Sequence, residues 1–343
     1  MNTHTPPAAV RSLKDVLNYL FGHHTLNREE ARTVLGDIAS GQCPPAQIAA
    51  FMTVYLMRKI TVEELAGFRD AMLERCIPAD LADFDPIDLC GTGGDGRDTF
   101  NISTLAAFIT AGAGVPVAKH GNYGVSSVSG SSNVVEYLGG TFTNDPAVLR
   151  RQMEASNICF MHAPLFHPAM KHVGPIRKEL GVKTFFNMLG PMVNPAFPRK
   201  QLVGVFSLEL ARLYAYLYQQ SGKRFAILHS LDGYDEISLT GPCKVISNQG
   251  ERVLTPEHFG MAPVRPEALY GGADIESAAR LFLRVLRNEG TEAQKHVAVI
   301  NAGMAIACAR EGMSLEAAVA LAGDSLESGK ALGAFERFVG SRK

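Results

Sequence analysis

Before about residue 80, apolar residues recur every three or four positions along this chain, a spacing typical of short amphipathic helices. Asn27 and Glu30 have the spacing of a capping box. Thr61 and Glu64 repeat that spacing, and Pro45 suits a first helical position. Short helices bury few faces among themselves, so we expect this segment to pack against a second domain or a partner subunit. The apolar stripes are Leu13, Val16, Leu17, Leu20 and Phe21; Ala31, Val34, Leu35 and Ile38; and Ile48, Phe51, Met52 and Tyr55.

From about residue 81, short β-like runs alternate with helical patterns, which indicates an α/β sheet. A hairpin is predicted around 245–253, and helices return from Ile275, with 297–300 open to either helix or strand. The predicted fold class is α/β: a small N-terminal helical domain at 1–80, and a larger α/β domain at 81–343 with a central, mostly parallel (mixed) sheet flanked by helices. The strands are predicted at 85–90, 115–118, 157–161, 202–206 and 224–229.

Composition narrows the class of protein. The formal net charge of −1 provides no basic face, so we expect no nucleic-acid partner. No stretch approaches the roughly 18 apolar residues that a membrane span requires, and the N-terminus lacks the apolar core of a signal peptide. We therefore expect a cytoplasmic protein without a membrane segment. The cysteines have no metal-binding spacing and are expected to be reduced thiols: Cys43, Cys76, Cys90, Cys159, Cys243 and Cys308.

A glycine-rich segment, Gly91–Gly96, stands between a predicted strand and a helical pattern that begins near Leu105. Strand, glycine loop and helix N-terminus together direct backbone N–H groups at a phosphate. The dinucleotide fingerprint fits poorly, because the next strand delivers Lys119 where an acidic residue is needed. A Walker A loop fails because Arg97 and Asp98 replace the required Lys-Ser/Thr pair. A loop for a phosphate that carries a sugar remains, beside the alternative of a glycine-rich turn without a ligand.

A second polar loop follows the next predicted strand, from Lys119 to Ser132, and holds five serines, three glycines and only two aliphatic residues. Long connections of this kind inside a compact domain tend to be functional. Ligands of open α/β sheets bind beyond the carboxyl ends of the strands, so we expect the two loops to meet there.

The loops belong to an ordered set of motifs: Gly91-Thr-Gly-Gly-Asp95; Asn101-Ile-Ser-Thr104; Lys119-His-Gly-Asn122 with Ser126-Ser127; His167-Pro-Ala-Met-Lys-His172 followed by Arg177; Asn187-Met-Leu-Gly-Pro191 with Asn194-Pro195; and Asp235-Glu236. With these motifs the chain resembles the anthranilate phosphoribosyltransferase family over about residues 10 to 335. The resemblance implies transfer of the ribose 5-phosphate of phosphoribosyl pyrophosphate (PRPP) to anthranilate, with release of pyrophosphate, in tryptophan biosynthesis. It also implies a homodimer through the helical domain, and a return of part of 165–195 to that domain.

The same resemblance implies roles for individual residues. Arg177 offers a planar donor fork for the anthranilate carboxylate, with Gly91 and Asn122 completing that site. Asp235 and Glu236 are implied as Mg²⁺ ligands together with Ser103. Without the resemblance, this acidic pair would be interpreted as surface charge and Arg177 as a solvated cation. The implied PRPP-binding residues are Gly91, Gly94, Asp95, Thr99, Asn101, Ser103, Thr104, Lys119, Ser127 and Ser131.

No general base is assigned, because a structural role fits each candidate histidine equally well; the candidates are His120, His162, His167, His172 and His229. The chain departs from the family's common pattern at three places: Tyr123-Gly124 replaces Arg followed by Ala or Ser, Asn133 replaces an aspartate, and Tyr234 replaces a leucine. Two alternatives stay open: a pyrimidine nucleoside phosphorylase of the same fold, and a non-catalytic, nucleic-acid-binding paralogue.

Overall fold

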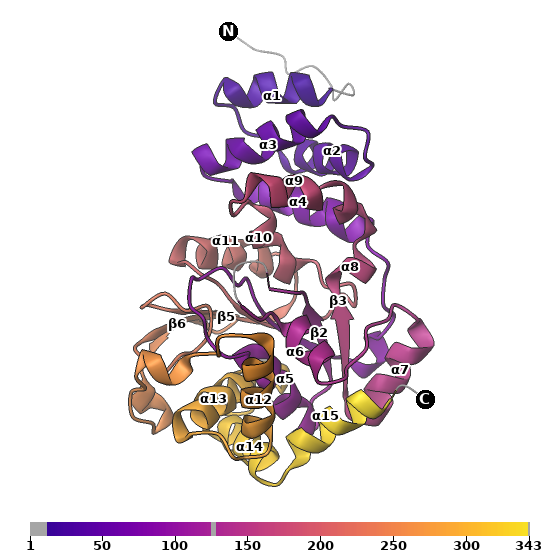
Figure 1. Cartoon of the computed structure of the whole chain (residues 1–343). Helices are drawn as coiled ribbons and strands as arrows, with labels where there is room; N and C mark the ends of the chain where they lie inside the picture. Colours follow the sequence, from indigo (N-terminus) through magenta and orange to yellow (C-terminus); the bar gives the residue numbers. More distant parts are fainter. Residues whose placement is uncertain (1–11, 125–127, 342–343) are drawn as a thin grey trace. The chain divides into compact units, whose positions relative to one another are not determined.

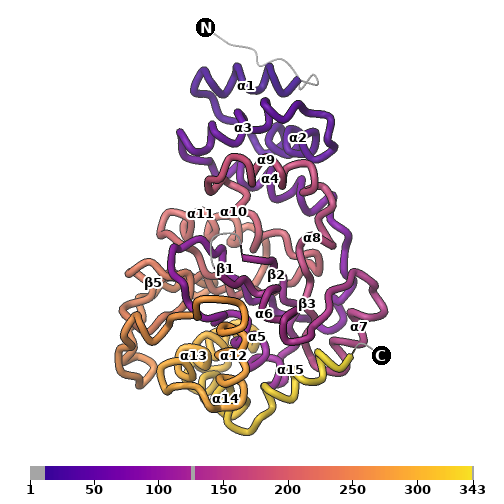
Figure 2. The backbone as a smooth tube through the Cα atoms, viewed as in Figure 1, coloured from indigo at the N-terminus to yellow at the C-terminus, as the bar shows by residue number. Residues whose placement is uncertain are grey.

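The computed structural model describes residues 12–124 and 128–341, and the chain divides into two compact units (Figure 1). One unit is helical and comprises the chain up to Cys76 together with His167–Val193. The other is an α/β unit and comprises Ile77–Phe166 and the chain from Asn194 onward. The backbone therefore leaves the helical unit, returns to it once, and leaves it again (Figure 2). No helix of the described residues combines the length and the apolar character needed to cross a membrane.

The helical unit confirms the predicted helix starts. Asn27 and Glu30 form a capping box, with the Asn27 side chain accepting from the Glu30 N–H at 2.9 Å. Thr61 and Glu64 form another. Phe21 departs from its predicted stripe, because it is the last residue of its helix and its side chain is 58% exposed. The elements are α1 (Leu13–Phe21), α2 (Arg28–Ala39), α3 (Pro45–Met57), α4 (Val62–Glu74), η2 (Pro168–His172), α9 (Gly174–Leu180), α10 (Phe186–Leu189) and η3 (Gly190–Met192), where η denotes a 3₁₀ helix.

Aromatic rings join the returning segment to the N-terminal helices. Phe185 stacks on Phe68 of α4 with ring centroids 4.6 Å apart. Its edge contacts reach Tyr55 at 5.2 Å and Phe51 at 6.0 Å, both on α3. These four side chains are nearly or fully buried, so the core of the helical unit is shared between segments more than 100 residues apart in sequence.

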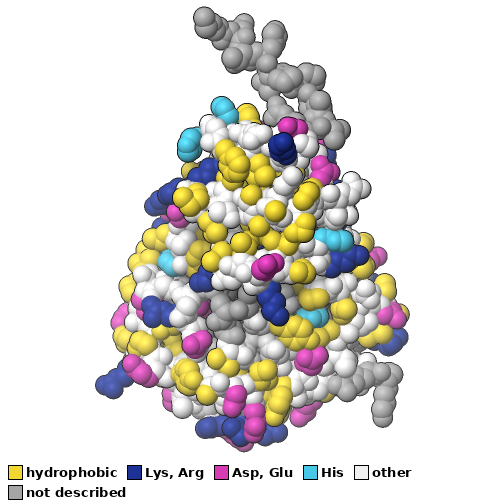
Figure 3. Space-filling view, turned by 45° about the horizontal axis from the view of Figure 1, so that its top comes forward, with side chains coloured by type: hydrophobic (Ala, Val, Ile, Leu, Met, Phe, Trp, Pro, Cys, Tyr) yellow, Lys and Arg dark blue, Asp and Glu magenta, His cyan; other side chains and the backbone are white. Residues whose placement is uncertain are grey.

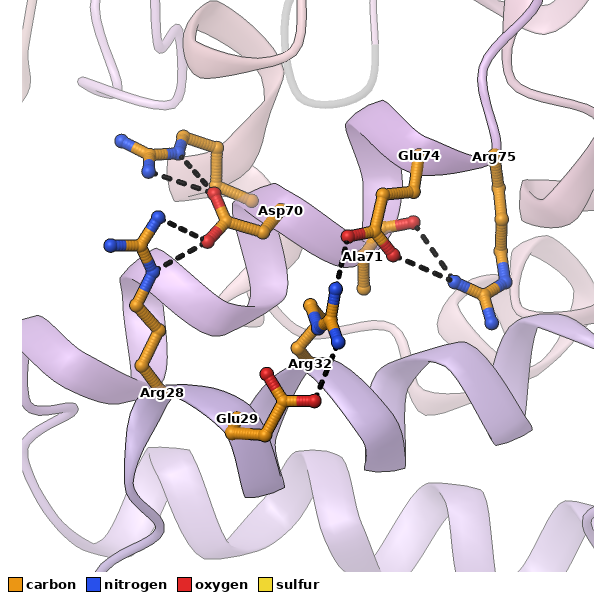
Figure 4. A network of polar contacts seen from close by, with 8 residues as sticks. Arg28, Glu29, Arg32, Asp70, Ala71, Glu74 and Arg75 are labelled. Atoms are coloured by element: carbon orange, nitrogen blue, oxygen red, sulfur yellow. Dashed lines mark hydrogen bonds and ion pairs between the residues drawn. The ribbon is translucent and has the colours of Figure 1, made fainter.

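Helices α2 and α4 pack closely and are also joined by ion pairs (Figure 4). Arg28 Nε donates to Asp70 at 2.6 Å, and Arg32 bridges Glu29 and Glu74. Apart from the partly buried Asp70 these side chains are exposed, so each pair contributes little. The close approach itself depends on Gly67, because a Cβ there would overlap the carbonyl oxygen of Arg28.

We predict that Gly67→Ala destabilises the protein by about 1–3 kcal/mol, because the added methyl group forces α2 and α4 apart. Gly323→Ala is the matched control, since this helical glycine has open space around it and should gain up to about 1 kcal/mol. Urea unfolding followed by circular dichroism measures both changes. Equal effects of the two substitutions would contradict the packing argument.

The α/β unit contains, within the described residues, a seven-stranded sheet in the order β3-β2-β1-β4-β5-β6-β7. Strands β1 to β5 are parallel, and β6 and β7 form an antiparallel hairpin at one edge, as predicted. The strands are β1 (Ile87–Gly91), β2 (Val117–Gly121), β3 (Ile158–His162), β4 (Lys200–Gly204), β5 (Arg224–Ser230), β6 (Cys243–Ser247) and β7 (Gly250–Leu254). The helices are η1 (Ala82–Phe84), α5 (Ile102–Gly112), α6 (Ser131–Tyr137), α7 (Pro146–Ser156), α8 (Ala163–Phe166), α11 (Leu208–Gln219), η4 (Pro256–Phe259), η5 (Pro266–Leu269), α12 (Ile275–Leu286), α13 (Glu292–Ala309), α14 (Leu315–Glu327) and α15 (Lys330–Gly340).

Side chains on successive strand positions point to opposite faces of the sheet, and the two faces have separate cores. Ile158 and Phe160 belong to the large core formed with α5, α12, α13 and α15. Cys159 and Met161 belong to a smaller core formed with α7. This alternation is what a parallel sheet covered on both faces requires. The ambiguous stretch 297–300 is helical and wholly buried within α13, which packs on α5, α14 and the sheet.

Two strands, β1 and β2, begin two residues later than predicted. β1 and β2 each start directly after a proline, Pro86 and Pro116, because proline has no N–H for the sheet ladder. β2 also continues to Gly121, so Lys119 and His120 lie inside the strand rather than in the loop that follows it.

Candidate active site

The glycine loop lies at the carboxyl end of β1, next to β2, its parallel neighbour. Gly93, Gly94 and Gly96 all have positive φ angles, of 61°, 72° and 74°, a conformation that other residues rarely adopt. No atom lies within 4 Å of the place where a Cβ would stand on Gly93 or Gly96, so this backbone is open to close approach. The loop leads into α5, whose N-cap is Asn101.

The acidic pair follows β5 and is bound to this loop through two backbone N–H groups. Gly93 N donates to Asp235 Oδ2 at 2.7 Å, and Ser103 N, at the start of α5, donates to Glu236 Oε1 at 2.9 Å. A Cβ on Gly91 would overlap the Asp235 carboxylate. Glycine is therefore required at that position for the two segments to meet.

Negative charge is concentrated at this place. Burial, and then the charge of Asp95, raise the pKa of Asp235 to about 7. Burial raises the pKa of Glu236 well above its ordinary value, and the charges of Asp235 and Asp95 add to that effect. Burial also raises the pKa of Asp95. Three carboxyl groups are thus held together, with backbone N–H groups that only partly stabilise their ionised forms.

The second loop is organised around Asn122 and Asn133. Asn122 O accepts from Ser132 N at 3.1 Å and from Ser131 Oγ at 3.3 Å. Asn133 Oδ1 accepts from two backbone N–H groups, those of Gly124 and Gly130. The predicted ligand Ser127 lies outside the described residues.

The two loops are joined by the side chain of Asn101, whose Nδ2 donates to Ser129 O at 3.1 Å. The structure thus brings together, in the α/β unit, the glycine loop, the first turn of α5, the second loop and the acidic pair. Thr99 pairs with Tyr270 in an isolated antiparallel bridge, and Thr104 is buried in the first turn of α5.

Lys119 is placed differently from a loop cation. Its side chain is 1% exposed, and Nζ donates to Leu89 O of β1 at 2.6 Å. Burial lowers the pKa of Lys119, and the charge of Glu236 is among those that oppose this shift. The ammonium group therefore acts from within the sheet, as a buried positive charge that favours ionised Glu236.

Sequence reasoning missed two further features of this region. Arg97 lies against Asp232 and Tyr234, next to the acidic pair, and no spacing rule marks an arginine in a glycine loop for such a role. Asp88 is fully buried in β1, where it accepts from His120 N at 3.2 Å and from Gln201 Nε2 at 3.1 Å. The available signal was an acidic residue inside an apolar strand pattern.

Comparisons with known proteins show the family of this chain. The α/β domain of a glycosyl transferase family matches residues 84–332, and the helical bundle domain of a glycosyl transferase family matches residues 14–76. The anthranilate phosphoribosyltransferase of Christiangramia forsetii is 59% identical over 325 residues, which are 95% of this chain and 98% of that protein. The chain belongs to the anthranilate phosphoribosyltransferase family.

Solved structures of anthranilate phosphoribosyltransferases share the fold. The enzyme of Thermus thermophilus superimposes with a TM-score of 0.89 and is 36% identical, covering 95% of this chain and 99% of that one. The enzyme of Saccharomyces cerevisiae, in complex with PRPP and Mg, gives a TM-score of 0.88 at 27% identity, covering 96% and 97% of the two chains.

Arg177 is the residue that the family resemblance implies for binding the anthranilate carboxylate. It lies on α9 of the helical unit. Its Nη2 donates to Asn187 Oδ1 at 3.4 Å, and its guanidinium carbon lies 5.2 Å from the ring centroid of Phe186. Burial lowers the pKa of Arg177. The guanidinium is thus oriented by an amide and a ring, and no carboxylate of the described residues pairs with it at ion-pair distance.

Among the candidate general bases of this family member, His167 is poorly suited to take up a proton. Its side chain is 3% exposed, and its Nε2 lies 2.9 Å from Val193 O, which fixes that nitrogen as the donor. Burial lowers the pKa of His167 to about 4. The geometry indicates a structural role, because this contact joins the first and last residues of the returning segment.

We predict that His167 makes unfolding pH-dependent. The unfolded chain takes up a proton on this side chain below about pH 6.5, whereas the folded protein does so only near pH 4. A contribution on the order of 3 kcal/mol is therefore present above pH 6.5 and is lost as the pH falls toward 4. His167→Gln should flatten the pH dependence of unfolding, and an NMR resonance of the His167 ring that titrates near pH 6.5 would contradict the argument.

Proposed function

We propose that this chain transfers the 5-phosphoribosyl group of PRPP to the amine of anthranilate, giving N-(5-phosphoribosyl)anthranilate and pyrophosphate, in tryptophan biosynthesis. The observation that carries the proposal is the binding of the acidic pair to the glycine loop and α5, through Gly93 N and Ser103 N, at the carboxyl ends of parallel strands. Family membership over nearly the whole chain supports it. The proposed location is the cytoplasm, where the unpaired cysteines would stay reduced.

PRPP would bind along the glycine loop and the start of α5. Gly91 and Gly94 would let the backbone approach the pyrophosphate, and the open surroundings of Gly93 and Gly96 support that role. Asn101 and Ser103 stand at the N-terminus of an 11-residue helix, where N–H groups and the helix dipole favour a phosphate. The other proposed PRPP residues are Asp95, Thr99, Thr104, Lys119, Ser127 and Ser131.

The acidic site fits Mg²⁺. Asp235 is buried and Glu236 is partly buried, and their carboxyl groups repel each other, so a divalent cation would relieve that repulsion. No group of three or more His, Cys, Asp or Glu side chains in the described residues is arranged to hold a metal by itself. Asp235, Glu236 and Ser103 would hold Mg²⁺ sparsely, as this ion prefers when substrate phosphates supply further oxygens. Bound there, it would offset the negative charge of the pyrophosphate.

The chain's own residues would act mainly by binding and orientation. The anthranilate amine is neutral near pH 7 and can attack the anomeric carbon without a strong base. Negative charge grows on the departing pyrophosphate, and N–H groups of the glycine loop and α5 are fixed before the reaction to receive it. Two substrates held together supply proximity. No histidine is assigned a proton transfer.

The proposal is tested by mixing the protein with Mg²⁺, PRPP and anthranilate and following the loss of anthranilate fluorescence. The proposal expects consumption of anthranilate that requires both PRPP and protein. Phosphate with thymidine, in place of these substrates, tests the nucleoside phosphorylase alternative. An unchanged anthranilate signal with an intact, folded protein would overturn the proposal.

We predict that Asp235→Asn combined with Glu236→Gln lowers kcat/KM by about 100-fold or more, because the pyrophosphate departs without its counter-charge. The amide oxygens can still accept from Gly93 N and Ser103 N, so the loop should keep its place. Loss of the buried like charges should leave Tm unchanged or raised. Glu311→Gln, at an exposed ion pair, is the control and should retain full activity. Near-normal turnover of the double variant would mean that the pair has no role in catalysis.

We propose that Arg177 binds the anthranilate carboxylate, with Gly91 and Asn122 contributing to anthranilate binding. The support is chemical: a partly buried guanidinium, held by Asn187 and the Phe186 ring, keeps a planar donor fork available for a carboxylate.

Replacing Arg177 by alanine should raise the KM for anthranilate by about 10- to 150-fold, the equivalent of a lost charge-assisted contact of roughly 1.5–3 kcal/mol. Arg177→Lys should recover only part, since an ammonium group lacks the planar fork. The KM for PRPP should change little. Steady-state kinetics with each substrate varied in turn measure the two KM values. Equal increases in both would contradict a contact of Arg177 with anthranilate alone.

We propose a homodimer formed through the helical unit. Apolar side chains are numerous on the face of this unit seen in Figure 3, and Met57 is 82% exposed, Phe21 58% and Leu56 46%. Large exposed apolar side chains gathered on one small unit are typical of an interface.

We expect Met57→Glu to give monomers, because a charge in a desolvated interface is costly, while its exposure in the single chain leaves the fold intact. Val253→Glu, at an exposed position of the edge strand β7, is the control and should leave the dimer unchanged. Light scattering after size exclusion measures both. A wild-type protein that runs as a monomer at micromolar concentration would end this proposal.

A further inference from the structure

Arg97, in the glycine loop, lies across the turn that carries the acidic pair. Its Nη2 donates to the carbonyl oxygen of Asp232, and its guanidinium carbon lies 4.8 Å from the ring centroid of Tyr234. A Cβ on Gly233 would stand 3.4 Å from the same Nη2. The guanidinium therefore follows the surface of the turn from Asp232 to Tyr234, directly before Asp235.

The turn offers a fixed platform for this contact. Gly233 N donates to Ser230 O at 2.8 Å, and Ser230 N donates to Tyr234 O at 3.0 Å. The Tyr234 ring is 4% exposed and belongs to the large core of the α/β unit. Arg97 itself is exposed. The core thus fixes the position of the Tyr234 ring, and the ring in turn fixes the guanidinium of Arg97.

The loop needs such a fixed point. Its glycines with positive φ leave the backbone free to adopt other conformations unless side chains or ladder bonds restrain it. At its start, Gly93 N is bound to Asp235, and at its end Asp98 O accepts from Gly271 N at 2.7 Å. Arg97 restrains the stretch between these points, where its own N–H donates to Asp95 Oδ1 at 3.0 Å.

We propose that Arg97 and Tyr234 are positioning residues, and that this Arg97–Tyr234 clamp holds Asp95 and the acidic pair at the spacing that PRPP with its Mg²⁺ requires. The inference rests on the proposed function and names further residues of that same site. The clamp acts through the residues it orients, so Arg97 does not itself contact the substrate. A direct phosphate contact would require the guanidinium to leave the Asp232 carbonyl and the Tyr234 ring.

The test uses Arg97→Met, Tyr234→Leu, the double variant, and Arg97→Lys. Methionine keeps the unbranched apolar part of the arginine side chain without the guanidinium group, and leucine keeps an apolar side chain in the core without a ring. Calorimetric titration with PRPP in the presence of Mg²⁺ gives the dissociation constant, kinetics give KM and kcat, and thermal unfolding gives Tm. Arg150→Met is the matched control, because Arg150 likewise lies over an aromatic ring, Phe84 at 5.0 Å, and is ion-paired with Asp83.

The clamp predicts that each single variant raises the dissociation constant and the KM for PRPP by about tenfold, equivalent to about 1.4 kcal/mol. The double variant should be no worse than Arg97→Met alone, since that substitution already removes the contact with the Tyr234 ring. Arg97→Lys should restore binding in part, because an ammonium group still attracts the ring face. Arg150→Met should leave binding and both kinetic constants unchanged.

Two results would overturn the clamp. Unchanged PRPP binding in Arg97→Met is one. The other is weakened binding in Arg97→Met with normal binding in Tyr234→Leu, which would show that the Tyr234 ring takes no part in holding Arg97. A wild-type protein that binds PRPP in the calorimeter but consumes no anthranilate would defeat the proposed function alone, and the binding constants of the variants would still decide the clamp.

Discussion

The binding of Asp235 to the amide of Gly93 is the contact on which the rest of the site depends. It joins two segments 142 residues apart, at the ends of strands that are not hydrogen-bonded to each other in the sheet. β4 lies between β1 and β5, and Gly204 at its end has no side chain, so the carbonyl oxygen of Asp235 can pass close to it. One carboxylate can thus reach across a strand because two glycines, Gly91 and Gly204, leave room for it.

This arrangement has an electrostatic cost in the absence of ligand. Carboxyl groups are held where burial and mutual repulsion disfavour their ionised forms, and Lys119, itself buried, offsets that cost only in part. Sites that keep such uncompensated charge are generally ones prepared for an opposite charge that arrives with a ligand. The packing of the sheet against its helices contributes the folding free energy that offsets this electrostatic cost.

Much of the fold could be predicted from local patterns, because periodicity, capping boxes and prolines act within a few residues. Asn27 and Thr61 mark helix starts by their own side chains, and the hairpin follows from its turn residues. Contacts between segments far apart in the chain leave weaker signals in the sequence. The start of the strand at Pro116 was blurred because apolar residues stand on both sides of that proline, Val115 and Val117. The position of Lys119 inside β2 depends on pairing with β3, which no local pattern reveals.

In the site, too, local features could be predicted and contacts between distant segments could not. The glycine loop and the start of α5 could be predicted because strand, loop and helix are contiguous there. That Asp235 belongs with them came from the family resemblance, and its chemistry alone would have suggested a solvated turn. Arg97 carried no signal, since its partners are a carbonyl oxygen and a ring far along the chain.

The shared core of the helical unit has a consequence for synthesis on the ribosome. Phe185 completes the ring cluster of Phe51, Tyr55 and Phe68, yet it is made more than 100 residues after Phe68. At about 5–20 residues per second, the nascent helices wait on the order of ten seconds with an unfinished apolar surface. During that interval the chain elongates through β1, β2 and β3. The N-terminal helices are therefore made well before they can finish folding, and their exposed rings are candidates for chaperone binding until the returning segment emerges.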